Sequence, residues 1–181
     1  IYMDKFHQLL IERHSIRRYT DEPVAADDVQ KILQAALLAP SSKSKRPWQF
    51  VVVENRDMLQ QLAGCKDFGT KPVSTAAFAV AVAVDASQSD CFVEDASIAA
   101  VFMQLQAEAL GIGSCWIQVR NRFTADGTPA EDIVRDTLAI PEHLTVECIV
   151  TFGHKDEVRR PVDPDKLLWE KVHIERWKPQ E

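Results

Sequence analysis

The chain has 181 residues, of which 46% are hydrophobic and 27% charged, and this ordinary globular composition predicts one domain over residues 1–181 with a full core. Its formal charge of −6 offers no global attraction for nucleic acid. Its longest apolar stretch, residues 76–84, is far shorter than the ~20 residues that a membrane span needs, so no membrane partner is expected.

The first half of the chain begins with two amphipathic helices. Residues 3–13 carry apolar side chains at helical spacing, and a second apolar stripe runs from an acidic start at residue 26 until just before Pro40. Residues 41–47 then form a polar loop. We expect a strand at residues 50–53, a short helix at residues 58–62 and a strand buried on both faces at residues 76–84.

One long helix dominates the second half. Residues 93–110 place mainly alanines on their apolar side, which suits a central helix or a subunit interface, and Gly111 and Gly113 are expected to end it. A strand at residues 114–119, a helix at residues 130–138 and a β-rich segment at residues 144–152 follow.

The last segment, residues 159–181, has no helical pattern but includes Trp169 and Trp177. Two tryptophans would expose a large apolar surface in an isolated tail, so we expect the tail to pack against another part of the protein or another subunit. Helices and strands are mixed along the chain without regular βαβ order. This arrangement favours an α+β fold over a doubly wound sheet.

The cysteines and the first residues indicate the compartment. Cys65, Cys91, Cys115 and Cys148 form no C-x-x-C pair and have no histidine at metal-ligand spacing, so we predict free thiols and no metal site. Residues 1–5 lack the apolar core of a signal peptide, and the expected native start is Met3, with two added residues before it. A cytoplasmic protein is therefore predicted.

Three basic clusters stand out in this acidic chain. They lie at residues 13–18, 43–46 and 159–160, and the first two are interleaved with serines. Cations and hydroxyls in this pattern suit a bound anion such as a phosphate. The alternative is that the clusters are three solvated surface patches, as charge runs usually are.

Motifs for other chemistries are missing. Gly111-Ile112-Gly113 lacks the third glycine of a dinucleotide fingerprint and follows a helix instead of a strand. The sequence contains no phosphate-binding P-loop, no H-E-x-x-H and no G-x-S-x-G. The five histidines have no Cys or Ser partner at a telling spacing. No catalytic side chain is therefore predicted.

Four segments form ordered motifs over nearly the whole chain. Residues 12–19 read ERHSIRRY, residues 39–50 APSSKSKRPWQF, residues 109–117 ALGIGSCWI and residues 172–177 VHIERW. The first three resemble the R-x-S-x-(R/K)-x-(Y/F), A-P-S-x-x-N-x-Q-P-W-x-F and A-x-G-L-G-S-C-W-I motifs of the nitroreductase family of FMN enzymes. The fourth resembles tails in one branch of that family.

The resemblance implies a fold and an assembly. The fold is a central, mostly antiparallel sheet flanked by helices. The assembly is a homodimer in which two subunits share each FMN site and the tail, residues 159–181, wraps over the partner. Because the cofactor carries the hydride chemistry, the protein needs only to bind it and tune its electronics, which agrees with the lack of a catalytic triad.

The resemblance also implies which residues contact FMN. Residues 13–15 correspond to the positions that hold the phosphate and ribityl end, and Arg17 to the basic residue at the pyrimidine side of the ring. Residues 41–44 fall on the loop that edges the flavin, and residues 116–118 lie against the ring. Arg159, rather than Lys155 or Arg160, completes the phosphate site. The full set is Arg13, His14, Ser15, Arg17, Ser41, Ser42, Lys43, Ser44, Trp116, Ile117, Gln118 and Arg159.

Three positions depart from the family pattern. Ser44 stands where the family has Asn, and Arg46 where it has Gln. Serine is shorter than asparagine and has no amide, while Arg46 adds a permanent charge. Gln118 follows Ile117, where the family often has Gly. The first two changes bear on substrate preference more than on FMN binding.

The implied function is an FMN-dependent oxidoreductase. NAD(P)H would reduce the flavin and leave, and an electron-poor acceptor such as a nitroaromatic, a quinone or an activated alkene would then use the same site, a ping-pong mechanism. The alternatives are a flavin reductase or reductive dehalogenase on the same scaffold, a non-catalytic flavin-binding or flavin-sensing protein and, without the resemblance, a plain anion-binding module. The sequence leaves open the acceptor and the choice between NADH and NADPH.

Overall fold

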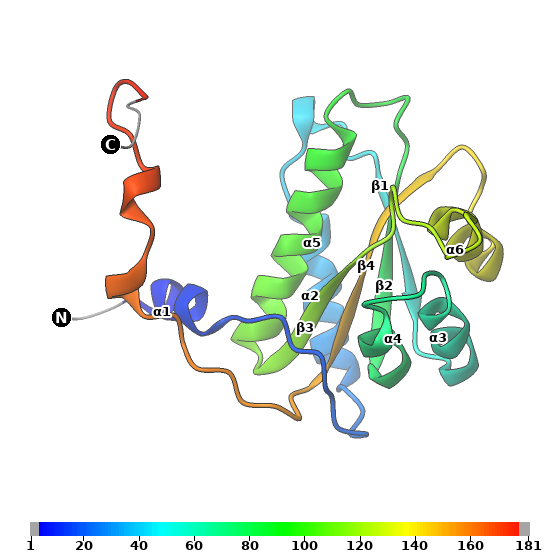
Figure 1. Ribbon diagram of the computed structural model, residues 1–181, viewed down its shortest axis with the longest axis horizontal. Coiled ribbons are helices and arrows are strands. Elements are labelled where there is room, and N and C mark those ends of the chain that lie inside the picture. The colour runs from blue at the N-terminus through cyan, green and yellow to red at the C-terminus, as the bar shows by residue number, and fades with distance from the viewer. Residues whose placement is uncertain (1–3, 178–181) are drawn as a thin grey trace.

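Four strands form one sheet in a computed structural model that describes residues 4–177 (Figure 1). Their order across the sheet is β1 (Trp48–Val53), β2 (Phe78–Val84), β4 (Thr145–His154) and β3 (Ile112–Gln118). Each neighbouring pair is antiparallel. The predicted α+β fold with an antiparallel central sheet is confirmed, whereas the expected start at Met3 lies outside the described residues.

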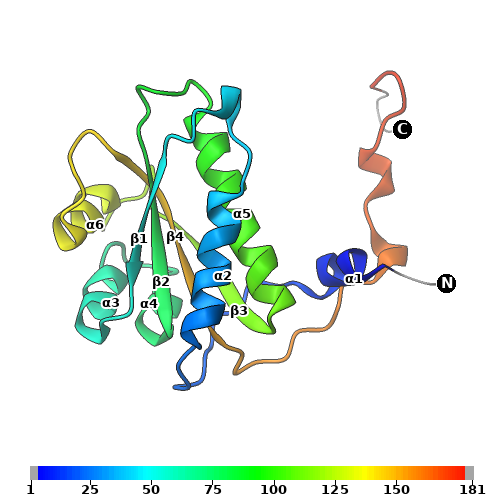
Figure 2. The ribbon, with the colours of Figure 1, turned by 180° about the vertical axis from the view of Figure 1, so that it is seen from behind.

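Helices cover both faces of the sheet (Figure 2). α2 (Ala26–Leu37) and the long α5 (Phe92–Ala109) pack on one face, and α3 (Arg56–Ala63), α4 (Lys71–Thr75) and α6 (Ala130–Leu138) pack on the other. Every side chain of β2 is buried because this central strand contributes to both apolar layers. The prediction of a strand buried on both faces is confirmed.

Several boundaries differ from the sequence pattern. β1 begins at Trp48 instead of residue 50, and β2 begins at Phe78, two residues into the apolar run. The pattern does not predict α4, because five residues are too few to display a helical period. The expectation that Gly113 ends the long helix is wrong: the chain turns at Gly111, where φ is 75°, and Gly113 already belongs to β3.

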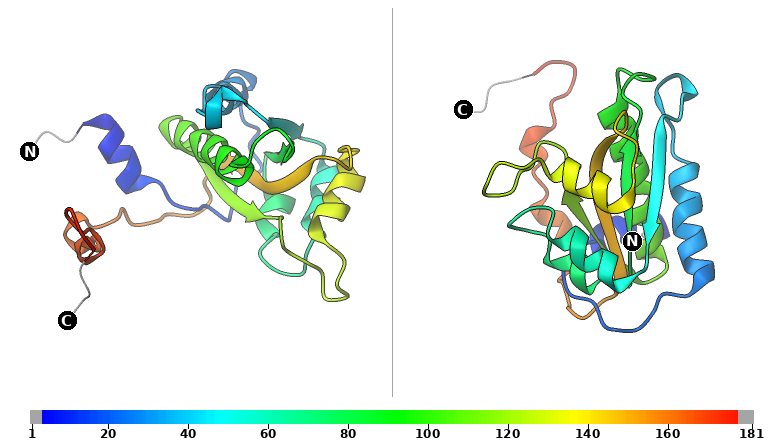
Figure 3. Two further views of the ribbon diagram at one scale, coloured as in Figure 1. Left: turned by 90° about the horizontal axis from the view of Figure 1, so that it is seen from above. Right: turned by 90° about the vertical axis from the view of Figure 1, so that its right-hand side faces the viewer.

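α1 (Lys5–Glu12) and the C-terminal segment reach away from the sheet on the same side (Figures 1 and 3). The Val162 N–H donates a hydrogen bond to the Ile11 carbonyl (3.0 Å), which joins the two segments. Beyond this point the tail makes two short 3-10 turns, and the side chains of Trp169 and Trp177 remain 68% and 73% exposed. Within one chain, the tail therefore leaves a large apolar surface uncovered.

Candidate functional site

Residues 13–20 follow the edge of the sheet as an extended segment, beside β3 and the end of β4. The Ile16 N–H donates to the Ser114 carbonyl (2.9 Å), and the Thr20 N–H donates to the His154 carbonyl (3.0 Å). These two bonds fix the first basic cluster to the sheet at the edge that β3 forms.

Two facing glycines let this segment approach the sheet closely. Gly113 and Gly153 are partners in the β3–β4 register. A Cβ added to Gly113 would lie 2.9 Å from the Ile16 Cβ, and one added to Gly153 would lie 2.9 Å from ring carbons of Tyr19. Both side chains are buried there, and the Tyr19 hydroxyl shares a 2.8 Å hydrogen bond with Thr151 Oγ1. Only residues without a side chain fit below Ile16 and Tyr19.

We expect Gly153→Ala to lower the free energy of unfolding by about 1–3 kcal/mol, because the new methyl group overpacks the Tyr19 ring. Chemical denaturation measures the loss. The matched control is a double-mutant cycle with Tyr19→Ala, since removal of the ring should remove most of the penalty. An equal loss with and without the Tyr19 ring would show that this close contact is not the cause.

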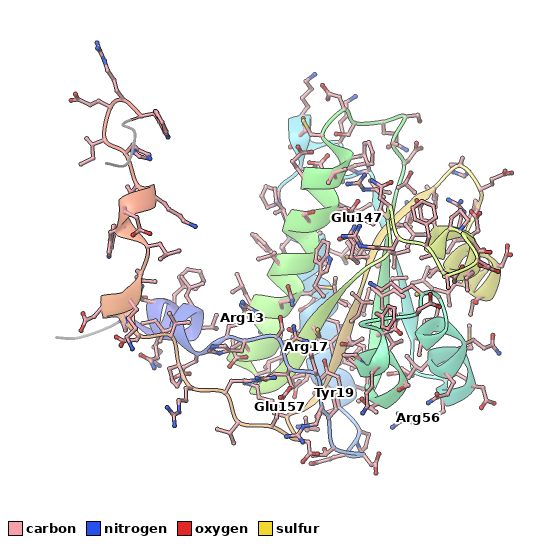
Figure 4. All side chains as sticks on the ribbon, in the orientation of Figure 1. Arg13, Arg17, Tyr19, Arg56, Glu147 and Glu157 are labelled. Carbon is pink, nitrogen blue, oxygen red and sulfur yellow. The ribbon has the colours of Figure 1, made fainter. Side chains whose placement is uncertain are left out.

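The segment carries the cations of the first basic cluster (Figure 4). Arg17 is exposed and Arg13 half-buried, and neither guanidinium has an ion-pair partner within residues 4–177. The Arg17 N–H donates to Glu157 Oε1 (2.5 Å), while Glu157 Oε2 accepts from Arg159 (2.7 Å). Glu157 thus brings the first and third basic clusters to one place.

The three candidate cations that follow β4 differ in their surroundings. The Lys155 ammonium pairs with Glu108 (2.6 Å), Arg159 pairs with Glu157, and Arg160 is exposed with no ion pair in the described part of the chain. The Arg17 N–H is the main cause that holds the pKa of Glu157 below its usual range. The carboxylate is therefore charged at neutral pH and keeps Arg159 next to the extended segment.

This donor set fits an anionic group. A cleft of ≈ 380 Å³ opens beside the cluster; its charged lining residues are Glu12, Glu108, Lys155, Glu157 and Arg159, while Arg13 and Arg17 lie outside its lining. The Arg13 and Arg17 guanidinium groups offer donors without a carboxylate to satisfy them, and a planar guanidinium binds phosphate oxygens in pairs. Ser15 is half-buried in the same segment, whereas the His14 Nδ1 is already bonded to the Glu12 carbonyl (2.8 Å).

The predicted ring-contact residues on β3 divide between its two faces. Ile117 is buried in the core, and in one chain it offers a ligand almost no surface. Trp116 and Gln118 lie on the other face, where the indole Nε1 donates to Gln118 Oε1 (2.9 Å). The buried Glu147 accepts from Gln118 Nε2 (3.3 Å) and from Arg120 Nε (2.5 Å). This chain of hydrogen bonds fixes the indole.

The serine-rich loop has a strained and tightly bonded backbone. Lys43, Ser44 and Arg46 have φ values of 50°, 54° and 51°, a region that residues with a Cβ seldom adopt. The Arg46 N–H donates to Ser41 Oγ (2.9 Å), and the Ser42 N–H donates to Oδ1 of the buried Asp95 (2.7 Å). These bonds offset the strain and give the loop one shape.

The loop and the arginine cluster lie far apart in one chain. The loop leads into β1 at Trp48, which pairs with Val84 of β2. The arginine segment pairs with Ser114 of β3. Ser114 pairs with Phe152 of β4, which in turn pairs with Phe78 of β2. Val84 and Phe78 are six residues apart on β2, which is about 20 Å along the strand. β1 and β3 are also opposite edges of the sheet. One chain therefore does not bring all the predicted residues together.

Sequence reasoning missed three carboxylates and a glycine that organise these parts. Glu157 links Arg17 to Arg159, Glu147 holds Gln118, and Asp95 holds the loop. An acidic residue is favourable in the first turn of a helix, and this alone explains Asp95 at the start of α5. No sequence signal therefore indicates its contact with the loop. Gly153 carries no signal either, because its neighbour Tyr19 is 134 residues away in the sequence.

The remaining candidate chemistries find no support in the described residues. Burial raises the pKa of the Cys65, Cys115 and Cys148 thiols, so they stay protonated at neutral pH. Over residues 4–177, the structure contains no group of three His, Cys, Asp or Glu side chains arranged to hold a metal ion. None of the described helices is long and apolar enough to cross a membrane.

The fold and the site define the class of protein: an α+β sheet packed between two helical layers, with a cluster of arginines at one edge. The nitroreductase family model matches residues 10–65 and 66–154. The chain belongs to this family, and the resemblance drawn from the sequence motifs is confirmed.

Individual relatives agree over the full length of the chain. A protein of Archaeoglobus fulgidus named "Putative NADH dehydrogenase/NAD(P)H nitroreductase" is 34% identical over 180 residues, which are 97% of this chain and 100% of the relative. The structure of an FMN-dependent nitroreductase from Clostridium difficile has a TM-score of 0.92 and 42% identity, with 94% of this chain and 99% of that chain covered. Nitroreductase A from Vibrio parahaemolyticus has a TM-score of 0.81 and 25% identity, with 99% and 79% covered.

Proposed function

We propose that the chain is an FMN-dependent oxidoreductase that uses NAD(P)H to reduce electron-poor acceptors such as nitroaromatics or quinones. The observation that carries the proposal is the arginine cluster at the β3 edge, whose Arg13 and Arg17 have no ion-pair partner among the described residues of a nitroreductase-family chain. FMN is a phosphate-bearing cofactor that supplies hydride transfer when bound.

Different residues of the site bind the phosphate end and the ring end of FMN. Arg13 and Ser15 bind the phosphate end, with Arg159 held beside them by Glu157. Arg17 faces the ring, where its charge stabilises the reduced cofactor. Trp116 and Gln118 offer a rigid surface for the ring face because Glu147 holds their hydrogen-bonded pair. The opposite location of residues 41–44 supports a site completed by the loop of a second copy of this chain.

We propose a homodimer for the same reason. Phe6, Leu38 and Phe102 line an apolar groove between α1, α2 and α5, and each is exposed in one chain. The tail adds the exposed Trp169 and Trp177. Contiguous apolar surface of this kind marks a protein interface. A second copy that covers both surfaces would also bring its loop to the arginine cluster. The free cysteines favour a cytoplasmic location.

The purified protein should be yellow, and NADH or NADPH should bleach the flavin absorbance without oxygen. Addition of a nitroaromatic or a quinone should restore the colour. A yellow protein that neither donor bleaches would be a flavin-binding or flavin-sensing protein and not an oxidoreductase. A colourless protein that does not take up added FMN would leave only a plain anion-binding module. If free FMN is the acceptor that restores the colour best, the protein is a flavin reductase. If a halogenated aromatic restores it best, the protein is a reductive dehalogenase.

Donor and acceptor are expected to alternate in one site, because the chain has one candidate flavin site and no second nucleotide-binding motif. Steady-state rates measured at several fixed acceptor concentrations should give parallel double-reciprocal lines. Intersecting lines would instead show that donor and acceptor are bound at the same time, and would overturn the shared site.

A further inference from the structure

The loop that precedes β1 presents three cations, and two of them, Lys45 and Arg46, have no role in the features described so far. Lys43, Lys45 and Arg46 are all exposed. None of them forms an ion pair with a carboxylate within residues 4–177. The chain as a whole carries a net charge of −6, so three neighbouring unpaired cations form a positive patch on an acidic protein.

The backbone of the loop that carries these cations is held in place by hydrogen bonds. The Ser44 N–H donates to the Ser41 carbonyl and the Lys45 N–H to the Ser42 carbonyl, each at 3.0 Å. The Ser41 hydroxyl and the Asp95 carboxylate accept two further N–H groups of the loop. Asp95 is fixed in turn by the Ser89 hydroxyl, which donates to its second oxygen (2.7 Å). A ligand that binds this loop therefore does not have to order it first.

The FMN phosphate is not the anion for this loop. Within the proposed site that phosphate belongs to Arg13 and Arg159, and residues 41–44 edge the ring, at the other end of the cofactor. The ring end of FMN has no phosphate of its own. An anion at this end has to come from the molecule that meets the ring, and the proposed electron donor carries phosphates.

We propose that Lys45 and Arg46 bind the 2′-phosphate of NADPH and make this phosphate-bearing donor the preferred one. The inference rests on the proposed function. NADPH differs from NADH only in the 2′-phosphate, so a cluster that contacts that group discriminates between the two, while one that contacts the shared pyrophosphate does not. Guanidinium and ammonium groups bind a phosphate dianion through charge-assisted hydrogen bonds.

The test compares both donors on the FMN-loaded protein and on a double variant that combines Lys45→Gln and Arg46→Asn, two residues outside the segment that edges the flavin. Asparagine tolerates positive φ, so the strained position of Arg46 keeps its backbone shape. We expect kcat/KM for NADPH to fall about tenfold or more and kcat/KM for NADH to stay within about twofold. An equal fall for both donors would assign the cations to the pyrophosphate and overturn the proposal.

A binding measurement gives a readout that does not depend on turnover. Calorimetric titration of the FMN-loaded protein should show tighter binding of 2′,5′-ADP than of 5′-AMP, and the double variant should lose this preference. The preference should also weaken as salt is raised. Lys45→Gln alone, at a position with ordinary φ, should give an intermediate loss if the double variant is unstable.

Lys31→Ala is the matched control. It also removes one exposed cation, but that cation is paired with Asp28 on α2 (3.0 Å), and such surface pairs contribute little. It should leave the donor preference unchanged. If both donors bleach the flavin equally in the wild type and in the variant, the proposed function stands and this inference fails. If 2′,5′-ADP binds through the loop but neither donor bleaches the flavin, the proposed oxidoreductase function fails instead.

Discussion

Replacement of Arg13 by alanine is expected to weaken FMN binding roughly 10- to 100-fold, since a hydrogen bond to a charged group contributes about 1.5–3 kcal/mol. Arg13 is half-buried and has no ion-pair partner within residues 4–177, so no protein carboxylate competes with the phosphate for its guanidinium. The phosphate keeps its charge whatever the redox state of the cofactor. Oxidised and reduced FMN should therefore be weakened about equally.

Arg17→Ala should behave differently, because Arg17 is proposed to face the ring, where negative charge increases on reduction. The variant should bind reduced FMN less tightly than oxidised FMN, and the midpoint potential should fall by about 30–60 mV; 30 mV corresponds to ~1.4 kcal/mol for two electrons. Potentiometric titration after reconstitution with excess FMN measures the shift, which should be much smaller for Arg13→Ala.

Arg18→Ala provides the control for both arginines. Arg18 is exposed in the same segment, its backbone carbonyl accepts from the Asp156 N–H (3.0 Å), and its charge is only the smallest of the causes that lower the pKa of Glu157. Its side chain should be dispensable for FMN affinity and potential. A potential shift in Arg13→Ala but not in Arg17→Ala would reverse the two assignments. No change in either variant would mean that both are solvated surface arginines.

Deletion of residues 159–181 is expected to dissociate the dimer and to release most of the FMN. The deletion removes Arg159 from the phosphate end together with the exposed Trp169 and Trp177. Obligate interfaces commonly bury roughly 2,000–5,000 Å², and the tail supplies apolar area that one chain leaves uncovered. Sedimentation analysis measures the dimer, and the ratio of flavin to protein absorbance measures retention.

A shorter deletion, of residues 163–181, separates the two roles of the tail. It keeps Arg159 and the hydrogen bond from Val162 to Ile11, but removes both tryptophans. We expect it to weaken the dimer as much as the longer deletion and to release less FMN. If the chain without residues 159–181 stays dimeric, yellow and equally stable, the proposed role of the tail is wrong.

Local patterns in the sequence predicted most of the elements. The apolar stripes of α2 and α5 and the continuous apolar run of β2 are short-range signals, and each lies where the pattern indicates. The boundaries of the elements differ from the predicted ones where a local sequence rule competes with strand pairing. Gly113 resembles a helix-ending glycine, yet Gly153 pairs with it and draws it into β3. The five-residue α4 is too short to leave a periodic signal.

By itself, the sequence determined the family, the α+β class and the basic segments, because motifs, periodicity and charge are properties of neighbouring residues. The tertiary structure alone decided how those segments are arranged. It joined Arg17 to Arg159 through Glu157, seated Tyr19 on Gly153 and fixed the serine-rich loop through Asp95. It also placed that loop across the sheet from the arginines. Each of these contacts joins residues far apart in the chain, and only the pairing register of the strands and the packing of the helices bring such residues together.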